Sequence, residues 1–212
     1  MMFTTPIALT AACLAAVAAL VASERARRQR ARPVFKLLAS SAFVALAWVL
    51  PGSDTDYGRL ILVALALSWA GDALLLSSRS AMFVAGLAAF LAAHLAFATA
   101  FSLGAIDARA LAAALVVFAA AGAVVLRWLW PHLSKPLRAA VGAYVVAIGA
   151  MCALAVASSA ASGNPQLAIG AIGFAASDLA VAREQFVRQA AINKAWGLPA
   201  YYLSQLVLAW SV

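Results

Sequence analysis

Two aspartates, Asp72 and Asp178, lie inside segments that are otherwise apolar enough to cross a bilayer. An ionisable side chain at such a position costs at least ~2.5 kcal/mol on insertion scales, and such residues are retained mainly for chemistry, ion handling or a specific polar contact. Desolvation favours the neutral form of a carboxyl group, and two nearby carboxylates resist ionising together. The two aspartates can therefore supply a general acid and a general base to one apolar pocket.

Acid-labile ethers are one class of compound that suits such a pair. Protonation of the ether gives an oxocarbenium-like cation, which the second carboxylate stabilises while it activates water. The same two carboxylates could instead carry protons for a transporter. The residues alone leave both kinds of chemistry open.

Further polar side chains are expected in the same layer as the two aspartates. At 1.5 Å per residue, both carboxyl groups lie about 7–8 Å inside one end of their spans, and two tyrosines of other spans come to about 10 Å. His94 is expected deeper, about 20 Å from that end. A lysine that begins the second span can snorkel to the interface or meet a lipid phosphate. The candidate binding residues are Lys36, Ser68, His94, Tyr144, Ser177, Tyr201 and Gln205. Ser68 and Ser177 are each placed to hydrogen-bond the nearby carboxyl group.

The composition predicts an all-helical membrane protein. Of the 212 residues, 67% are hydrophobic and 10% charged, and the mean hydropathy is +0.99. Soluble domains have about 45–50% apolar and 25% charged residues. We therefore predict a single transmembrane domain, 1–212, folded as a bundle of eight helices, with seven as the alternative. The expected spans are 4–23, 35–50, 57–77, 81–102, 108–130, 137–158, 164–182 and 194–212.

The basic residues predict how the bundle is oriented. Thirteen of the 15 Lys and Arg residues fall in the first, third, fifth and seventh connections, and only Arg59 and Arg109 fall in the others. The positive-inside rule then places those four connections in the cytoplasm and both termini outside. The net charge of +8 is explained by this topology and by anionic lipid headgroups, so we expect membrane lipids, and no nucleic acid, as partners.

Other site types have little support in the sequence. Met1 to Pro6 carries no positive charge and the basic cluster comes after the apolar run, so the first segment is expected to be a retained helix instead of a secretory signal. Cys13 and Cys152 fall within spans and suit small core residues better than a disulfide. With His132 in a loop and no Cys or Glu near His94, the ligands of a zinc site are missing. We expect no metal and no cofactor.

A weak internal symmetry accompanies the two aspartates. They are 106 residues apart, half the chain, and each lies on the third span of its four-helix half. A parallel repeat, 1–106 and 107–212, would place them this way. Identity between the halves is slight, so a duplication remains a hypothesis.

Five stretches of the chain together resemble the YhhN/TMEM86 family of integral membrane proteins. The combination is Gly-Asp, then His about 22 residues later, then Ser-Asp and Tyr-x-x-x-Gln. The stretches are Val34 to Lys36, Gly71 to Leu75, Phe83 to His94, Gly170 to Asp178 and Tyr201 to Gln205. The chain departs from the family pattern at Leu37, Phe97 and Ser204, which puts the preferred headgroup and chain in doubt.

This resemblance implies eight transmembrane helices and hydrolysis of the vinyl ether bond of a lysoplasmalogen. The implied products are a fatty aldehyde and glycerophospho-ethanolamine or glycerophospho-choline. Asp72 and Asp178 would then be the catalytic pair, either one as the acid, with the lysophospholipid headgroup near Lys36 and its tail toward His94. The alternatives are a proton-coupled transporter and a noncatalytic binder of a small amphiphile. The expected location is the bacterial inner (cytoplasmic) membrane; the oligomeric state is left open.

Overall fold

The computed structural model describes residues 4–26, 28 and 30–212, and within them the chain forms eight α-helices. They are α1 (Thr4–Arg25), α2 (Arg32–Val49), α3 (Asp56–Leu74), α4 (Ser80–Ser102), α5 (Ala108–Leu129), α6 (Lys135–Ser162), α7 (Gln166–Ala182) and α8 (Ala191–Ala209). Three short helical segments join them: η1 (Pro51–Asp54), η2 (Trp130–His132) and η3 (Arg183–Val187). The prediction of an eight-helix, all-α bundle is confirmed.

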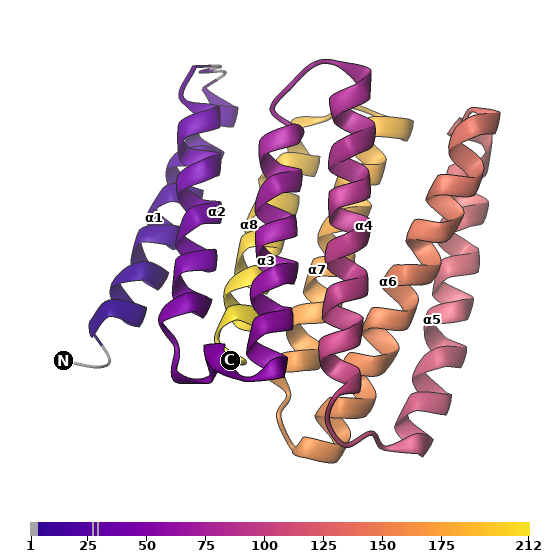
Figure 1. Cartoon of the computed structure of the whole chain (residues 1–212). Coiled ribbons are helices and arrows are strands. Elements are labelled where there is room, and N and C mark those ends of the chain that lie inside the picture. Colours follow the sequence, from indigo (N-terminus) through magenta and orange to yellow (C-terminus); the bar gives the residue numbers. More distant parts are fainter. Residues whose placement is uncertain (1–3, 27, 29) are drawn as a thin grey trace.

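Neighbouring helices run in opposite directions, so the connections form two sets at opposite ends of the bundle (Figure 1). The α1–α2, α3–α4, α5–α6 and α7–α8 connections, which contain most of the basic residues, lie at the upper end. The start of α1 and the end of α8 lie together at the lower end. We call the upper end the basic end.

Local signals in the sequence explain where several helices begin and end. Thr55 caps α3, its side chain accepting from the Gly58 amide, and Asp107 caps α5 by accepting from two amides of the first turn. Both satisfy N–H groups that have no partner inside the helix. At the C-terminus of α6, Gly163 adopts the left-handed conformation with φ 72°, which suits a residue without Cβ.

The chain is a multi-pass membrane protein. Among the described residues, six helices, α1 to α6, are long and apolar enough to cross a membrane. Helix α7 has 17 residues, fewer than the ~20 needed for a full crossing, but η3 continues it for five more. The sequence prediction ended this helix at 182 and missed that continuation.

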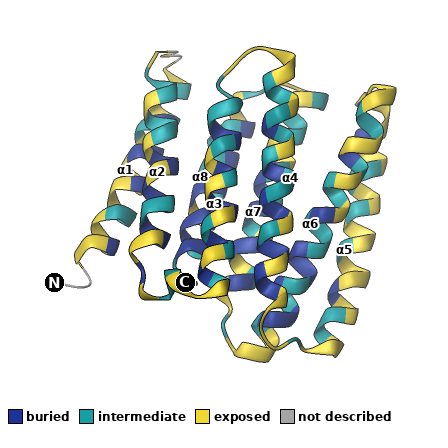
Figure 2. Cartoon of the chain, viewed as in Figure 1, coloured by how far each residue is buried: buried dark blue, intermediate teal, exposed yellow. Residues whose placement is uncertain are grey.

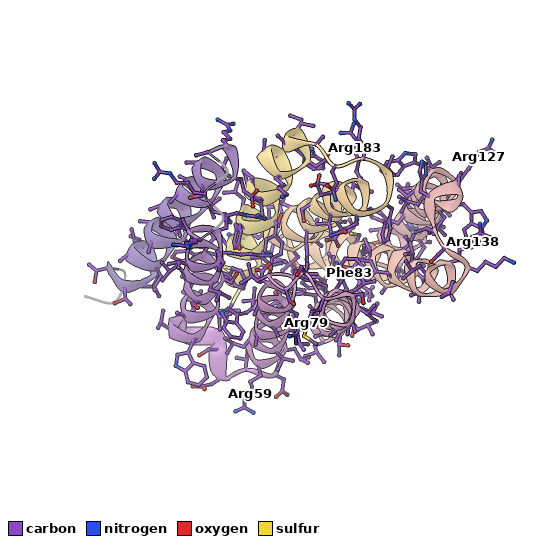
Figure 3. All side chains as sticks on the ribbon, turned by 90° about the horizontal axis from the view of Figure 1, so that it is seen from above. Arg59, Arg79, Phe83, Arg127, Arg138 and Arg183 are labelled. Carbon is purple, nitrogen blue, oxygen red and sulfur yellow. The ribbon has the colours of Figure 1, made fainter. Side chains whose placement is uncertain are left out.

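The helices form an elongated bundle with a buried centre. Seen from above, α1 and α2 lie at one end, α5 and α6 at the other, and α3, α4, α7 and α8 between them (Figure 3). Burial is greatest in the middle and least along α5, which is mostly exposed (Figure 2). Large buried side chains, among them Phe43, Phe97, Phe174 and Tyr202, fill the centre. Both aspartates lie against this aromatic core.

Candidate active site

Asp72 lies near the end of α3 and is held by three donors from two other helices. Its side chain is 3% exposed. Lys36 Nζ of α2 lies 3.1 Å from Oδ1, while Ser40 Oγ and Tyr201 Oη donate to Oδ2 at 2.5 and 2.9 Å. All three groups are hydrogen-bond donors, and one is a cation. This environment therefore stabilises the ionised carboxylate.

A glycine makes the approach of α4 to this carboxylate possible. A Cβ at Gly71 would lie 2.6 Å from the Phe90 ring, so only glycine lets the two helices pack this closely. Phe90 in turn packs edge-on against Tyr201, with ring centroids 5.9 Å apart. The glycine before Asp72 thus lets α4 approach α3, and it sets the position of the Phe90 ring, which packs against Tyr201, a hydrogen-bond partner of Asp72.

Asp178 of α7 has a separate set of partners. Tyr144 Oη of α6 donates to its Oδ2 at 3.2 Å, and His94 Nε2 of α4 lies 3.2 Å from the same oxygen. His94 is fully buried, stacks on Phe174 at 4.3 Å between centroids, and contacts the carbonyl of Phe90 through Nδ1 at 2.6 Å. The contact between His94 and Asp178 is close, but it lacks the angle of a well-aligned hydrogen bond.

The contact with Phe90 determines where a proton must lie in this cluster. A carbonyl oxygen only accepts, so Nδ1 of His94 carries a hydrogen and donates it. A neutral imidazole would then turn the lone pair of Nε2 toward Asp178, against a carboxylate. A proton on Nε2 or on the carboxyl group would remove this conflict between the two groups.

Both aspartates line one cavity of about 430 Å³. We call it the inner cavity. Its walls come from every helix except α5, and its inner part is formed by Phe90, Tyr144 and Tyr201 beside the two carboxyl groups. A volume in this range is typical of small-molecule sites. No contact joins the two carboxyl groups among the described residues, so they share the cavity as two separate clusters.

Four charged residues surround the inner cavity at the basic end. Glu24 of α1 pairs with Arg32 of α2 and, at 3.2 Å, with Lys194 of α8; Lys194 also lies 3.9 Å from Glu184 of η3. We call Glu24, Arg32, Glu184 and Lys194 the mouth. The buried Asn193 fixes its α8 side, accepting from Arg183 at 2.9 Å and donating to Glu184 at 2.8 Å. Arg127 and Arg138, in contrast, lie at the periphery of the bundle (Figure 3).

The structure brings together most of the residues singled out from the sequence, with corrections. Lys36 pairs with Asp72 instead of standing free for a lipid phosphate. Ser68 and Ser177 do not contact the carboxyl groups; they donate to the carbonyls of Ala64 and Phe174 in their own helices. Gln205 is fully buried but does not line the inner cavity, and neither amide atom has a hydrogen-bond partner there.

Two further differences concern depth and an unforeseen residue. His94 was expected far deeper than Asp178, yet the two are in contact. Part of the reason is η3, which moves the end of the α7 segment from Ala182 to Val187 and so places Asp178 deeper. Ser40, which bonds Asp72, was missed. Its position on α2, one turn after Lys36, was the only available signal.

Other candidate chemistry finds no support in the described part of the chain. No group of three His, Cys, Asp or Glu residues could hold a metal ion there. The thiols of Cys13 and Cys152 are buried and unpaired with each other, and each donates to a backbone carbonyl. The two aspartates, which line the inner cavity, are the candidate catalytic residues.

Comparison with known proteins identifies the family. The sequence model of the YhhN family matches residues 31–212, which include both carboxyl clusters. This chain belongs to the YhhN family. A Mycobacterium bovis protein named lysoplasmalogenase is 36% identical over 176 residues, which are 81% of this chain and 65% of that protein. The human protein named lysoplasmalogenase TMEM86A is 34% identical over 157 residues, 71% of this chain and 64% of its own length.

The alignments leave part of each relative uncovered. This YhhN chain matches 65% of the length of the mycobacterial relatives and 64% of the human one. No solved structure matches the chain. The function proposed below therefore rests on the geometry of the two carboxyl clusters and on membership of the YhhN family.

Proposed function

We propose that this YhhN protein is a membrane-embedded hydrolase that cleaves the vinyl ether bond of lysoplasmalogens. The products would be a fatty aldehyde and glycerophospho-ethanolamine or glycerophospho-choline. One observation carries the proposal: two carboxyl groups with different partners, the buried Asp72 and the 15% exposed Asp178, line a single cavity in a bilayer-spanning bundle. The name lysoplasmalogenase, given to relatives in bacteria and mammals, supports the same reaction. The location that we propose is the bacterial inner membrane.

We assign the acid role to Asp178. It lines the inner cavity, whereas His94 lies behind it and is fully buried. In this proposal the pair carries one proton, which Asp178 gives to the substrate while His94 Nε2 lies 3.2 Å from the same carboxyl group. His94 is then a positioning residue, fixed by the Phe90 carbonyl and by the stacked Phe174 ring. Tyr144 holds the same carboxyl oxygen from the other side.

Asp72 takes the role of the carboxylate. Lys36, Ser40 and Tyr201 each direct a donor at its oxygens and fix the carboxyl group in position. A fixed negative charge in a water-poor site stabilises a developing cation without reorganisation at the moment of reaction. It can also accept a proton from water as water attacks.

The reaction steps balance with these two groups alone. Asp178 gives its proton to the alkene carbon that is not bonded to oxygen, which leaves an oxocarbenium cation. Water bonds to the carbon next to the ether oxygen while Asp72 takes one of its protons, and a hemiacetal results. The hemiacetal hydroxyl then returns a proton to Asp178. The bond between the hemiacetal carbon and the glycerol oxygen breaks, and the glycerol oxygen takes the proton from Asp72. An aldehyde and an alcohol leave, and both carboxyl groups are restored.

The mouth is suited to the polar part of such a lipid. Arg32 and Lys194 can meet a phosphate, and Glu24 and Glu184 can meet an ammonium group. We place the headgroup at the mouth instead of near Lys36, where the sequence predicted it, because Lys36 is only 16% exposed against Asp72, whereas Arg32 and Lys194, although also paired, are 29% and 36% exposed. Four aromatic side chains line the inner cavity and offer apolar contact to the acyl chain: Phe83, Phe90, Tyr144 and Tyr201.

Lipid mass spectrometry of the purified protein tests the proposal. Incubation with a lysoplasmalogen is expected to release aldehyde, whereas a saturated lyso-ether and a lyso-ester stay intact. Asp72→Asn and Asp178→Asn should each lower kcat by about 10²-fold or more, the usual scale for acid–base groups. Asp54→Asn, an exposed aspartate of η1 at the opposite end, is the matched control and should keep full activity.

Two outcomes would favour the alternative functions. Uptake of an amphiphile into proteoliposomes under a pH gradient, with no product formed, would indicate a proton-coupled transporter. Saturable binding with neither turnover nor transport would indicate a noncatalytic binder. Full activity of both aspartate variants would refute the acid–base assignment itself.

A further inference from the structure

A second hollow, of about 820 Å³, lies on the outer side of α1 and α8. We call it the outer groove. Its α1 side includes Leu14, Ala18 and Ala22, and its α8 side includes Pro199 and Leu203. The surface is apolar along its length, and Arg25 lies at the end of α1 that reaches the basic end. An apolar groove with one cation at its end matches the shape and charge of a single-chain phospholipid.

The outer groove and the inner cavity are separated by the same two helices. Leu20 and Glu24 of α1 line the inner cavity, as do Leu198 and Tyr201 of α8. Residues one or two positions away from them on each helix line the outer groove. Helices α1 and α8, side by side, therefore form the wall between the two spaces, and the wall is a single layer of helices.

An ion pair closes this wall at the basic end. Lys194 Nζ of α8 lies 3.2 Å from Glu24 Oε2 of α1, and the two side chains are 36% and 15% exposed. Lys194 is the more exposed partner, so water screens this pair more than it screens the Lys36–Asp72 pair. The closing contact is therefore easier to break than the Lys36–Asp72 contact.

The surrounding contacts determine which helix can move. Helix α8 is fixed to α7, because a Cβ at Gly197 would lie 2.5 Å from the Ala180 Cβ and because Asn193 is bonded on both sides. Helix α1 is held at the opposite end, where Trp210 Nε1 donates to Thr10 Oγ1 at 3.0 Å. At the basic end, Glu24 links α1 to α8 through Lys194 and to α2 through Arg32, so this end of α1 can separate from α8 while it stays paired with α2.

We propose that the outer groove binds a single-chain phospholipid from the surrounding bilayer and passes it sideways between α1 and α8 into the inner cavity. The phosphate lies at Arg25 and the chain along Ala22, Ala18 and Leu14. Separation of Glu24 from Lys194 opens the wall, and the basic end of α1 moves while α8 stays on α7. The transfer rests on the proposed hydrolysis, whereas binding in the outer groove does not.

Photolabelling in lipid nanodiscs tests the binding step. The probe is a lysophosphatidylethanolamine with a diazirine in its chain, and labelled peptides are identified by mass spectrometry. We expect labelling on α1 around 14–22 and on α8 around 199–203, displaced by unlabelled lysophosphatidylethanolamine. Ala18→Trp fills the groove and should weaken that labelling about tenfold, equivalent to ~1.4 kcal/mol. Ala22→Trp should do the same, and thermal unfolding checks that both variants fold.

A matched control and a second substrate make the result decisive. Ala120→Trp places the same side chain on the exposed face of α5 and should leave labelling unchanged. Ala18→Trp should slow cleavage of a long-chain lysoplasmalogen in nanodiscs but not of a short-chain, water-soluble one that arrives through the mouth. Labelling spread evenly over lipid-facing helices, or displaced equally by a two-chain phospholipid, would overturn the inference. Groove labelling without any cleavage by the wild type would instead refute the proposed function.

Discussion

The ion pair between Lys36 and Asp72 is the most demanding contact in this chain. Both partners are taken out of water, with side chains 16% and 3% exposed. Desolvation of two charges costs several kcal/mol per ion, and their attraction offsets this only when geometry and further hydrogen bonds are good. Ser40 and Tyr201 supply those hydrogen bonds. The main effect of the pair is therefore to fix the position of the Asp72 carboxyl group in the site, and its net contribution to stability is small.

Replacement of Lys36 alone should consequently lower the stability of the protein more than replacement of both Lys36 and Asp72. Lys36→Met leaves a buried carboxylate without its cation and is expected to destabilise the protein by about 3–5 kcal/mol. Adding Asp72→Asn should restore much of the loss, while aldehyde release stays abolished. Thermal unfolding in detergent, run as a double-mutant cycle beside a cleavage assay, measures both effects. Additive losses of stability in the cycle would contradict the pairing.

The residues of the two clusters differ in how far the sequence could reveal them. Asp72, Asp178, Tyr144 and Tyr201 stand out because ionisable and phenolic groups are rare in such apolar segments. The partners of each carboxyl group could not be deduced, since hydroxyls choose between their own helix and a neighbour. The two serines nearest the aspartates in sequence bond their own helices, as serines in helices commonly do. The Ser40 hydroxyl also lies 3.0 Å from the Lys36 carbonyl of its own helix, and it reaches Asp72 because α2 packs beside α3.

Close contacts between helices determine where the functional side chains lie. Gly71 is the clearest case, because α3 meets the Phe90 ring of α4 where a Cβ would not fit. Gly142 on α6, in contrast, has no heavy atom within 4 Å of the Cβ position. Both are helical glycines, and only the first is needed for packing.

Alanine at these two positions should therefore act in opposite directions. Gly71→Ala forces Phe90 and α4 to shift and is expected to destabilise by about 1–3 kcal/mol with a fall in activity. Gly142→Ala should be neutral or stabilising by up to about 1 kcal/mol, since alanine favours helix. Unfolding temperatures of the two purified variants measure the contrast. Equal stability of both would show that the α3–α4 contact tolerates a methyl group.

The sequence predicts the helices of this chain well, apart from the continuation of the helical segment after α7. All eight predicted spans agree with their α-helices to within about four residues at each end, because apolar length and turn residues indicate both. After the seventh, the helical segment continues past Ala182 as η3, through the charged residues Arg183 and Glu184. Polarity normally marks the end of a span, so the continuation had no signal in the sequence.

At the scale of the whole molecule, the two ends of the bundle differ in charge. The basic end carries the connections expected in the cytoplasm, whereas the lower end carries both termini (Figure 1). The orientation in the membrane and the internal repeat stay predictions, because neither helix packing nor family membership reports on them.

Cysteine labelling in intact cells would determine the orientation. Cys13 and Cys152 are buried, so the wild type should react little with a membrane-impermeant maleimide. Gly104→Cys, in the exposed turn after α4, is expected to react from outside. Arg79→Cys, at the basic end, should react only after the membrane is made permeable. The reverse pattern would invert the topology and place the mouth outside.

The polar mouth and the apolar inner walls of one cavity also affect how the products leave. The two products of the proposed reaction differ sharply in solubility: the alcohol carries charge and drains through the mouth to water, while the aldehyde dissolves among acyl chains. Each departs into a different phase, so recombination requires them to meet again across an interface. The architecture would thus make turnover effectively one-way without any input of chemical energy beyond hydrolysis itself.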